Sequence, residues 1–355
     1  MALNPSGAIS LAGPSAGQSI AVELGVSATA TISLNDTNVR TLAGVASGVI
    51  VMPTDFYGKS NITGTQKAIF GFGNTTGPIV IQNMTNLVSS TGVVASDTPG
   101  VGTARRALAA AGYGDDKAIF GYGEIPATGN ESMTNLVSNT GVVASDTPGV
   151  GTARHRLAAA GYGDDKAIFG YGRPSPGGAF SMTNLVSNTG VVASDTPGVG
   201  SARQSLGAAG YGGDKAIFGF GSLANGTTTS ITNLVSSTGV VASDTPGVGT
   251  ARSNMAAAGY GGDKAIFGLV SAITNLVSNT GVVASDTPGA PGVSARSNAG
   301  AAGYGGDKAI FGYGSSGVAL SSTNLVSNTG VVASDTPGVG TARTLLAAAG
   351  YSLTA

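Results

Sequence analysis

Short apolar segments of five to seven residues alternate along most of the chain with turns rich in Gly, Asp, Asn and Pro. In one stretch these segments span residues 157–162, 166–171, 181–187 and 190–194. Runs of this length, bounded by turn residues, are typical of β-strands, and no stretch repeats apolar residues at the helical spacing of i, i+3, i+4 and i+7. The pattern therefore predicts four-stranded antiparallel units and argues against a helical solenoid.

The four-segment unit occurs six times. Its third segment, Thr-Asn-Leu-Val-Ser, begins at Thr85, Thr134, Thr183, Thr232, Thr274 and Thr323, at steps of 49, 49, 49, 42 and 49 residues. Four antiparallel strands in about 49 residues is the size of one β-propeller blade. We therefore predict an all-β fold: a six-bladed β-propeller over residues 61–355, preceded by a small segment with short strands and one short helix.

The two ends of the repeat predict how this fold closes. The first Lys-Ala-Ile-Phe, at Lys67, has no Ala-Ala-Gly-Tyr segment before it, whereas the chain ends with such a segment at 346–351. We expect 346–351 to be the innermost strand of the first blade, beside 67–73, because closure removes open sheet edges. Phe169 and Tyr171, two positions apart, should share one face of their strand and fill the space between blades.

The repeat also resembles a known motif. Its order is Arg, a strand of small residues, a short turn, Ile-Phe-Gly-Tyr-Gly, two further strands, a turn and the next Arg. This order resembles the kelch motif of the galactose-oxidase-like propellers over about residues 67–351, although the chain has no Trp and Gly-Tyr-Gly replaces the double glycine. The resemblance implies the architecture and no activity.

Residues 1–60 do not repeat. They predict extended segments at 6–11 and 22–33, and one helix within 33–44 that is capped by Asn35 or Asp36 and ends at Gly44. The combination Ile-Ser-Leu, Glu-Leu-Gly, Ile-Ser-Leu-Asn-Asp, Val-Arg-Thr-Leu-Ala-Gly and Asp-Phe-Tyr-Gly-Lys-Ser resembles a leader of tailed-bacteriophage virion proteins, tail proteins especially. The resemblance implies a virion location and attachment through 1–60 to other tail or baseplate proteins. Release by host lysis fits the lack of an export signal or an apolar span.

Composition excludes several functional classes. Lys and Arg number 17 against 18 Asp and Glu, so no basic excess favours nucleic acid. The chain has no cysteine and a single histidine, His155, which we expect to be a variable surface residue. We therefore predict no metal, no cofactor, no membrane insertion and no enzymatic activity. The alternative, a glycan-processing propeller enzyme, would need clustered acids, and Glu124 and Glu131 are the only acids after Asp55 that lie outside the repeat pattern.

One Asp and one Arg recur in every unit. They are Asp97, Arg105, Asp146, Arg154, Asp195, Arg203, Asp244, Arg252, Asp286, Arg296, Asp335 and Arg343. A functional interpretation makes them a polar ring for an anionic sugar. The structural interpretation, which we favour, pairs each Asp with the Arg that follows it across the turn, within one blade.

The connections between second and third strands vary in length and sequence. They span 74–83, 124–131, 173–180, 222–230, 269–272 and 315–320. An up-and-down blade places them on one face, where binding usually occurs. The candidate receptor-binding residues are Asn74, Thr75, Thr76, Glu124, Ile125, Glu131, Arg173, Pro174, Phe180, Leu223 and Asn225. We expect a tail-fibre-type adhesin that contacts a host surface glycan or protein; the alternatives are particle decoration or a baseplate role, with neutral drift of the loops and homo-oligomer formation left open.

Overall fold

The computed structural model describes residues 9–11, 19–24, 27, 29, 31–43, 49–52 and 65–353. The chain divides into two compact units, 1–63 and 64–355, close to the predicted change from unique to repeated sequence at residue 61. Among the described residues, no helix has the length and apolar character needed to cross a membrane.

The first unit contains two short helices, α1 (Ile20–Glu23) and α2 (Thr37–Ala43). Helix α2 confirms the predicted helix: the Asp36 carboxylate accepts the Ser33 N–H at 2.8 Å at its start, whereas Gly44 lies outside the described residues. The extended segment predicted from residue 22 is wrong at its beginning, since α1 includes Val22 and Glu23. Burial explains the helix, because α1 places Ile20 in the small apolar core of this unit.

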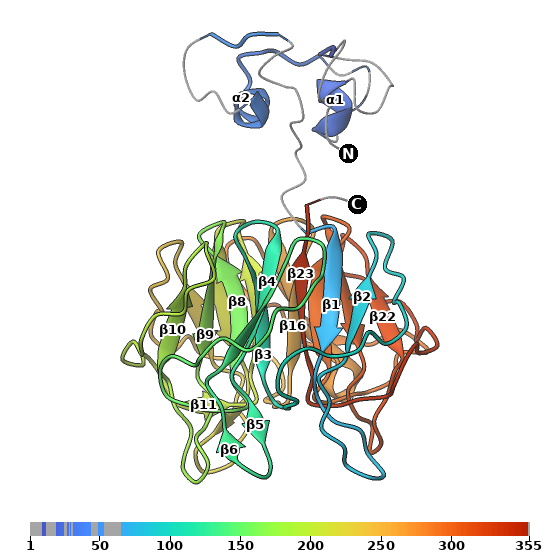
Figure 1. Cartoon of the computed structure of the whole chain (residues 1–355). Coiled ribbons are helices and arrows are strands. Elements are labelled where there is room, and N and C mark those ends of the chain that lie inside the picture. The colour runs from blue at the N-terminus through green and yellow to red at the C-terminus, as the bar shows by residue number, and fades with distance from the viewer. Residues whose placement is uncertain are drawn as a thin grey trace. The chain divides into compact units, whose positions relative to one another are not determined.

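The second unit contains six antiparallel sheets of three or four strands, numbered here by the order of their second strands along the chain, and two two-stranded pairs (Figure 1). Sheet 1 holds β23 (Ala347–Tyr351), β1 (Lys67–Gly71) and β2 (Thr85–Val88). Sheet 2 holds β3 (Ala109–Tyr113), β4 (Lys117–Gly121) and β7 (Thr134–Val137), and sheet 3 holds β8 (Ala158–Tyr162), β9 (Lys166–Gly170) and β10 (Thr183–Val186).

The remaining sheets follow the same order. Sheet 4 holds β12 (Gly207–Tyr211), β13 (Lys215–Gly219) and β15 (Thr232–Val235). Sheet 5 holds β16 (Ala256–Tyr260), β17 (Lys264–Gly268), β18 (Ile273–Val277) and β19 (Thr287–Pro288), and sheet 6 holds β20 (Gly300–Tyr304), β21 (Lys308–Gly312) and β22 (Thr323–Val326). Short strands β5 (Glu124–Ile125) and β6 (Gly129–Asn130) pair with each other, as do β11 (Arg203–Gln204) and β14 (Ser222–Leu223), and a 3-10 helix spans Val270–Ala272. The all-β prediction is confirmed for the described part of this unit.

The predicted fourth strand is not a regular strand in any sheet: residues 281–285 form only an isolated bridge in sheet 5, and β19 lies after them. In sheet 2, two isolated bridges join β7 to the segment 143–147, and that segment has one extra residue between them. Such an extra residue is a β-bulge, which interrupts the ladder and leaves a main-chain group unpaired. The side chain of Asn135 compensates by donating to the Ala144 carbonyl at 3.1 Å. The fourth segment therefore follows the sheet without forming a full strand.

The last strand of the chain completes the first sheet, as predicted. Strand β23 pairs with β1 from Lys67 opposite Tyr351 to Gly71 opposite Ala347, and β1 pairs with β2 on its other side. Figure 1 shows β23, β1 and β2 side by side. The two ends of the repeated region are therefore joined by a ladder of main-chain hydrogen bonds.

Main-chain hydrogen bonds also connect the sheets to one another at both ends of their first strands. At one end each residue donates its N–H to the equivalent residue of the preceding sheet at 2.7–3.1 Å. This loop-end ring runs Ala107 to Leu345, Leu345 to Asn298, Asn298 to Asn254, Asn254 to Ser205, Ser205 to Arg156 and Arg156 to Ala107. All six residues have positive φ, between 53° and 60°.

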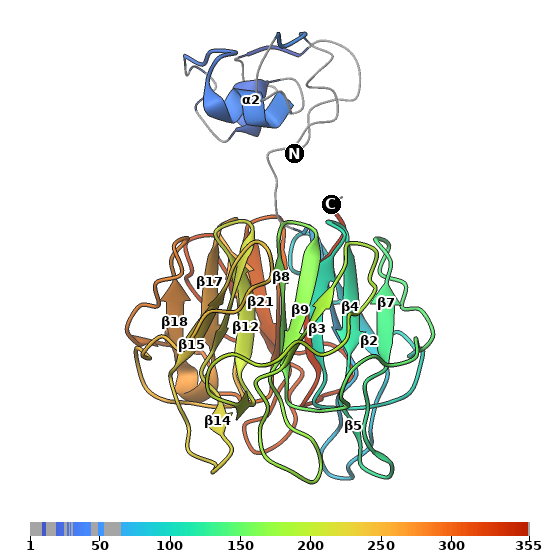
Figure 2. The same cartoon turned by 90° about the vertical axis from the view of Figure 1, so that its left-hand side faces the viewer.

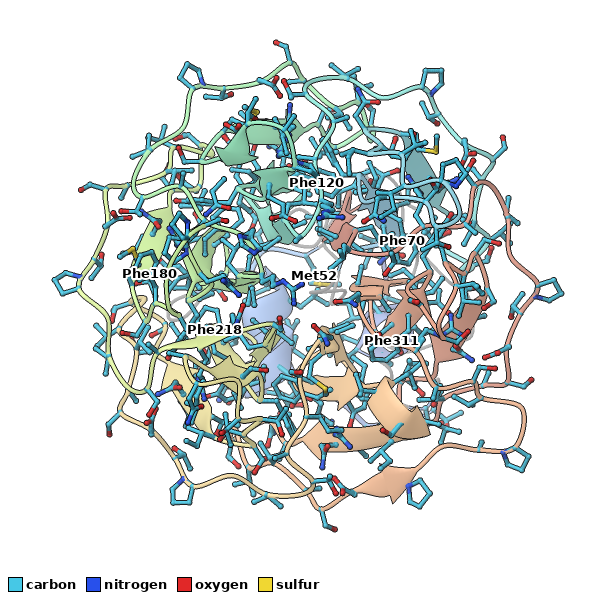
Figure 3. All side chains as sticks on the ribbon, turned by 90° about the horizontal axis from the view of Figure 1, so that it is seen from below. Met52, Phe70, Phe120, Phe180, Phe218 and Phe311 are labelled. Atoms are coloured by element: carbon cyan, nitrogen blue, oxygen red, sulfur yellow. The ribbon has the colours of Figure 1, made fainter. Side chains whose placement is uncertain are left out.

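A second ring links the opposite ends of the same strands at 2.6–3.0 Å. This turn-end ring runs from Gly114 to Asp165, Gly163 to Asp214, Gly212 to Asp263, Gly261 to Asp307, Gly305 to Gln66 and Ser352 to Asp116. The first strands of successive sheets also contact one another along their length, in the order β3, β8, β12, β16, β20, β23 and back to β3. Figure 3 shows the six sheets arranged around a common centre.

Aromatic side chains fill the space between sheets, but not as predicted. Phe169 packs against Tyr122 of sheet 2 with ring centroids 5.2 Å apart, whereas Tyr171 packs against Phe218 of sheet 4 at 5.1 Å. The expectation that Phe169 and Tyr171 share a face is wrong because Tyr171 has a φ of +64°, which turns its side chain to the other side. The packing leaves no room for a side chain at Gly121, where an added Cβ would lie 2.7 Å from Phe169.

We predict that removing residues 346–355 destabilises the second unit strongly. The truncation leaves the open edge of β1 unpaired and breaks the turn-end ring at Ser352. We expect the melting temperature to fall by roughly 10 °C or more, with aggregation through the free edge. Removal of 354–355 alone is the matched control and should change little. Equal melting temperatures for both truncations would contradict the role given to β23.

Candidate functional site

The variable connections lie at one end of the second unit, as predicted. Figures 1 and 2 show β5, β6 and β14 at the same end. Contacts between neighbouring connections agree: the Thr76 hydroxyl accepts the Ala319 N–H at 2.8 Å, and the Asn130 amide donates to the Arg173 carbonyl at 3.4 Å. We call this surface, made by residues 74–83, 124–131, 173–180, 222–230, 269–272 and 315–320, the loop face.

A cluster of ionisable side chains lies where sheets 2 and 3 meet the loop face. Antiparallel bridges bring Arg106 opposite Glu124 in sheet 2 and His155 opposite Arg173 in sheet 3. The Nε of Arg106 lies 2.8 Å from one Glu124 carboxylate oxygen, and the Nε2 of His155 lies 3.7 Å from the other. We call Arg106, Glu124, Asn130, His155, Arg156 and Arg173 the charged cluster.

His155 is buried in this cluster rather than exposed, so the predicted surface position is wrong. Only 6% of the residue is accessible, because the β5–β6 hairpin covers it and the Asn130 Oδ1 lies 2.8 Å from its Nδ1. Burial lowers the pKa of His155 to about 4; Glu124 opposes this shift, whereas Arg156 and the other cluster arginines add to it. The imidazole is therefore neutral at pH 7.

A small cavity opens at the centre of the same end, with a volume of about 70 Å³. Its rim is the loop-end ring, and its floor is apolar. The floor residues are Leu108, Leu157, Leu206, Met255, Ala299 and Leu346. We call it the axial cavity. The sequence indicates this cavity only indirectly, because the residue at its rim differs from repeat to repeat. These rim residues are Ala107, Arg156, Ser205, Asn254, Asn298 and Leu345.

Several predicted contact residues have internal roles. Asn74 is buried, with 3% of its surface accessible, and donates to the Thr75 carbonyl at 2.8 Å. The Thr75 hydroxyl in turn donates to Pro78 at 2.9 Å. Thr76 is exposed, as a contact residue should be, and so are Ile79 and Val80, 66% and 48% accessible, which our prediction missed. Asn74 is therefore no candidate for receptor contact.

The other predicted contact residues lie in the remaining long connections. Ile125, Pro174 and Leu223 are partly exposed, as is Glu131, which accepts the Thr128 hydroxyl at 3.2 Å. Asn225 is exposed and accepts the Thr227 N–H at 3.0 Å.

Phe180 lies apart from the charged cluster, in a separate groove. Together with Met182 and Pro197 it lines an open space of about 340 Å³ on the outer side of sheet 3. The candidate residues Arg173 and Phe180 thus do not form a single site: Arg173 belongs to the charged cluster and Phe180 to this groove.

The recurring arginines are buried structural groups. In sheet 3, Arg154 donates through Nε to the Tyr171 carbonyl at 2.8 Å, through Nη1 to the Thr152 carbonyl at 3.0 Å and through Nη2 to Asn184 at 2.7 Å. Its guanidinium lies 4.4 Å from the ring centre of Tyr122 in the preceding sheet. Five of the six arginines stack in this way on an aromatic ring of the preceding sheet. Each of these five arginines therefore joins its own sheet to the sheet before it.

The expected pairing of each Asp with the next Arg in the sequence is wrong. Arg154 lies 3.9 Å from Asp195, not beside Asp146, because the turn after each Asp leads into the next sheet. Arg154 and Asp195 nevertheless belong to the same sheet, as the structural interpretation expected of such a pair. Burial alone would raise the pKa of Asp195, but hydrogen bonds from Thr152 and Asn184 outweigh it and hold the pKa below 3.8. A Cβ at Gly151, whose φ is +75°, would lie 2.4 Å from the Asp195 oxygen.

Comparison with known proteins adds no assignment. No protein-family model matches the chain, and no curated protein sequence is significantly similar to it. Among the described residues, no three His, Asp or Glu side chains come together in a way that could hold a metal ion. The candidate site is therefore defined by its geometry: the loop face, the charged cluster and the axial cavity.

We predict that Arg154→Met lowers the free energy of unfolding by about 3–5 kcal/mol, since it leaves buried acceptors and Asp195 without their cation. The matched control is Lys166→Met, which removes a half-exposed lysine beside Asp165 and should leave stability nearly unchanged. Urea denaturation measures both. Equal effects would show that the buried arginine is not a structural centre.

We predict that His155 makes stability depend on pH between its ordinary pKa of 6.5 and its lowered pKa of about 4. In this window the unfolded chain binds a proton that the folded chain does not, so stability falls as the pH falls. His155→Gln, which introduces the residue found at the equivalent Gln204, should remove that part of the decrease. Melting curves from pH 7 to pH 4 measure the difference. Parallel curves for both proteins would contradict the buried neutral histidine.

Proposed function

We propose that residues 64–355 form a closed six-bladed β-propeller that serves as a rigid binding module. Support comes from the six sheets, from the two hydrogen-bonded rings that pass through every sheet, and from the pairing of β23 with β1. A rigid scaffold holds its exposed connections at fixed separations, which lowers the entropy lost on binding.

The proposed binding surface is the loop face, and one observation carries this proposal. The ionisable side chains that depart from the repeat gather there: the charged cluster and Glu131. Exposed apolar side chains outside the repeat pattern also lie there, namely Ile79, Val80 and Val318. Recognition requires side chains that differ from place to place, and the loop face supplies them.

We further propose that the protein belongs to a bacteriophage virion and contacts the host cell surface. The phage-type leader in residues 1–60 supports this, with tail or baseplate proteins as the partners of that segment and a host glycan or protein as the partner of the loop face. The activity is adhesion by contact. Glu124, one of the two acids that a glycan-processing enzyme would need, is paired with Arg106 at 2.8 Å, which favours adhesion over that alternative.

We predict that shortening the long connections weakens adsorption of the particle to host cells without unfolding the protein. Residues 74–83, 124–131, 173–180 and 222–230 are each replaced by Leu-Val-Ser-Ala, which sheet 5 carries at the same place. Loop length alone costs only about 0.6 kcal/mol per doubling, so the melting temperature should change little. Adsorption is measured as the fraction of particles bound per minute.

The control for this experiment uses the opposite end of the same sheets. Replacing the turn residue Asp164 by Gly, the residue at the equivalent Gly213, leaves the loop face intact and should preserve adsorption. Wild-type adsorption with all four connections shortened would contradict adhesion through the loop face and favour particle decoration or a baseplate role.

A further inference from the structure

Positive charge outside the repeat pattern is concentrated in one sector of the loop face. From residue 65 onward, one lysine and one arginine recur in each of the six units, and the remaining cations are Arg106, Arg156 and Arg173. All three belong to the charged cluster. The other sheets bring no such cation to this surface, so the loop face has a single cationic sector, next to the axial cavity.

Two of these three guanidinium groups have donors to spare. The Arg106 side chain donates to Glu124. Within residues 65–353 the Arg156 side chain makes one hydrogen bond, from Nη1 to the Ser205 hydroxyl at 3.4 Å. The Nε of Arg173 donates to Pro174 at 3.5 Å, the outer limit of a hydrogen bond. Since each guanidinium has five N–H donors, both can accept an anion in two-point contact.

Arg156 follows His155 in the chain, and His155 is bridged to Arg173, so two like charges lie in the same sector. Burial lowers the pKa of Arg156; Glu124 opposes the shift, and the charges of Arg173 and Arg106 lower the pKa further. An anion between the two guanidinium groups would relieve this repulsion, whereas a neutral ligand would not. The sector therefore favours a negatively charged group.

The axial cavity supplies the rest of a binding site. Arg156, Ser205, Asn254 and Asn298 give one side of its rim hydrogen-bonding groups, and the floor is apolar. The Oδ1 of Asn254 is buried and has no hydrogen-bond donor among the described residues, so it can accept a ligand hydroxyl. Hydroxyl groups beside apolar C–H faces are the chemistry of a sugar ring.

We propose that the loop face binds a carboxylated saccharide, with its carboxylate held by Arg156 and Arg173 and its hydroxyl groups at the rim of the axial cavity. This inference rests on the proposed binding function and names the class of its ligand. Nucleic acid does not fit, because three cations on a chain of net charge −1 provide too little counter-charge for a phosphate backbone.

Affinity electrophoresis of the full chain tests the inference. Native gels contain polygalacturonate, alginate or hyaluronate, or the methyl ester of polygalacturonate, which has the same backbone without the charge. We expect the chain to be retarded by at least one acidic polymer and not by the ester. Arg156→Gln and Arg173→Gln should each weaken that retardation by roughly tenfold or more. Lys215→Gln, a change of equal charge at the opposite end, should leave it unchanged.

Melting temperatures distinguish a loss of binding from a loss of folding in these variants. Melting temperatures within a few degrees of wild type show that the Arg156 and Arg173 variants are folded, and Asn254→Ala should reduce retardation through the cavity alone. Equal retardation by polygalacturonate and its ester, wild-type retardation of both arginine variants, or no retardation by any acidic polymer would each overturn the inference. If the shortened connections abolish adsorption while no acidic polymer binds, adhesion through the loop face is supported and the carboxylated saccharide is contradicted as its ligand.

Discussion

Main-chain hydrogen bonds between equivalent residues of successive sheets set the geometry of the second unit. Because the first strands are joined at both ends, they lie so close that the side chains packed between neighbouring first strands are small, as are Ala109 and Ala111. The ring at the loop end needs only an N–H and a carbonyl from each residue. Its side chains are therefore free to vary, and Ala107, Arg156 and Leu345 occupy equivalent places. The linkage of the first strands and the variability of the side chains at the loop end follow from the same bonds, despite the strain of positive φ at each residue of the loop-end ring.

The buried arginines serve the same arrangement through side chains. Arg154 donates hydrogen bonds to acceptors on its own sheet and stacks on Tyr122 of the preceding one, so the loss of one guanidinium affects two sheets. Pairing with Asp195 also keeps the recurring charges balanced within each sheet. The electrostatic potential at the loop face then comes chiefly from residues outside the repeat, because each recurring Arg lies beside a recurring Asp and the two charges cancel at short range.

The β-strands of the repeated region were largely predictable because one turn-and-strand pattern recurs six times, at a spacing of 49 residues in all steps but one. Strand positions and the pairing of β23 with β1 followed from it. Failures occurred where the backbone departs from regular geometry: Tyr171 turns its ring by a positive φ, and a bulge interrupts the fourth strand. The Asp–Arg partners and the burial of His155 depend on contacts between distant segments, which spacing along the chain does not encode.

The loop face is asymmetric although the scaffold repeats. Charged side chains lie over sheets 2 and 3, whereas the exposed Ile79, Val80 and Val318 belong to sheets 1 and 6, whose connections touch through Thr76. Exposed valines elsewhere recur in every unit, as Val142 does, and present the same surface in six directions. Such repeated groups cannot fix the orientation of a ligand. The residues that break the repeat can, because a ligand with one charged and one apolar side fits this face in a single orientation.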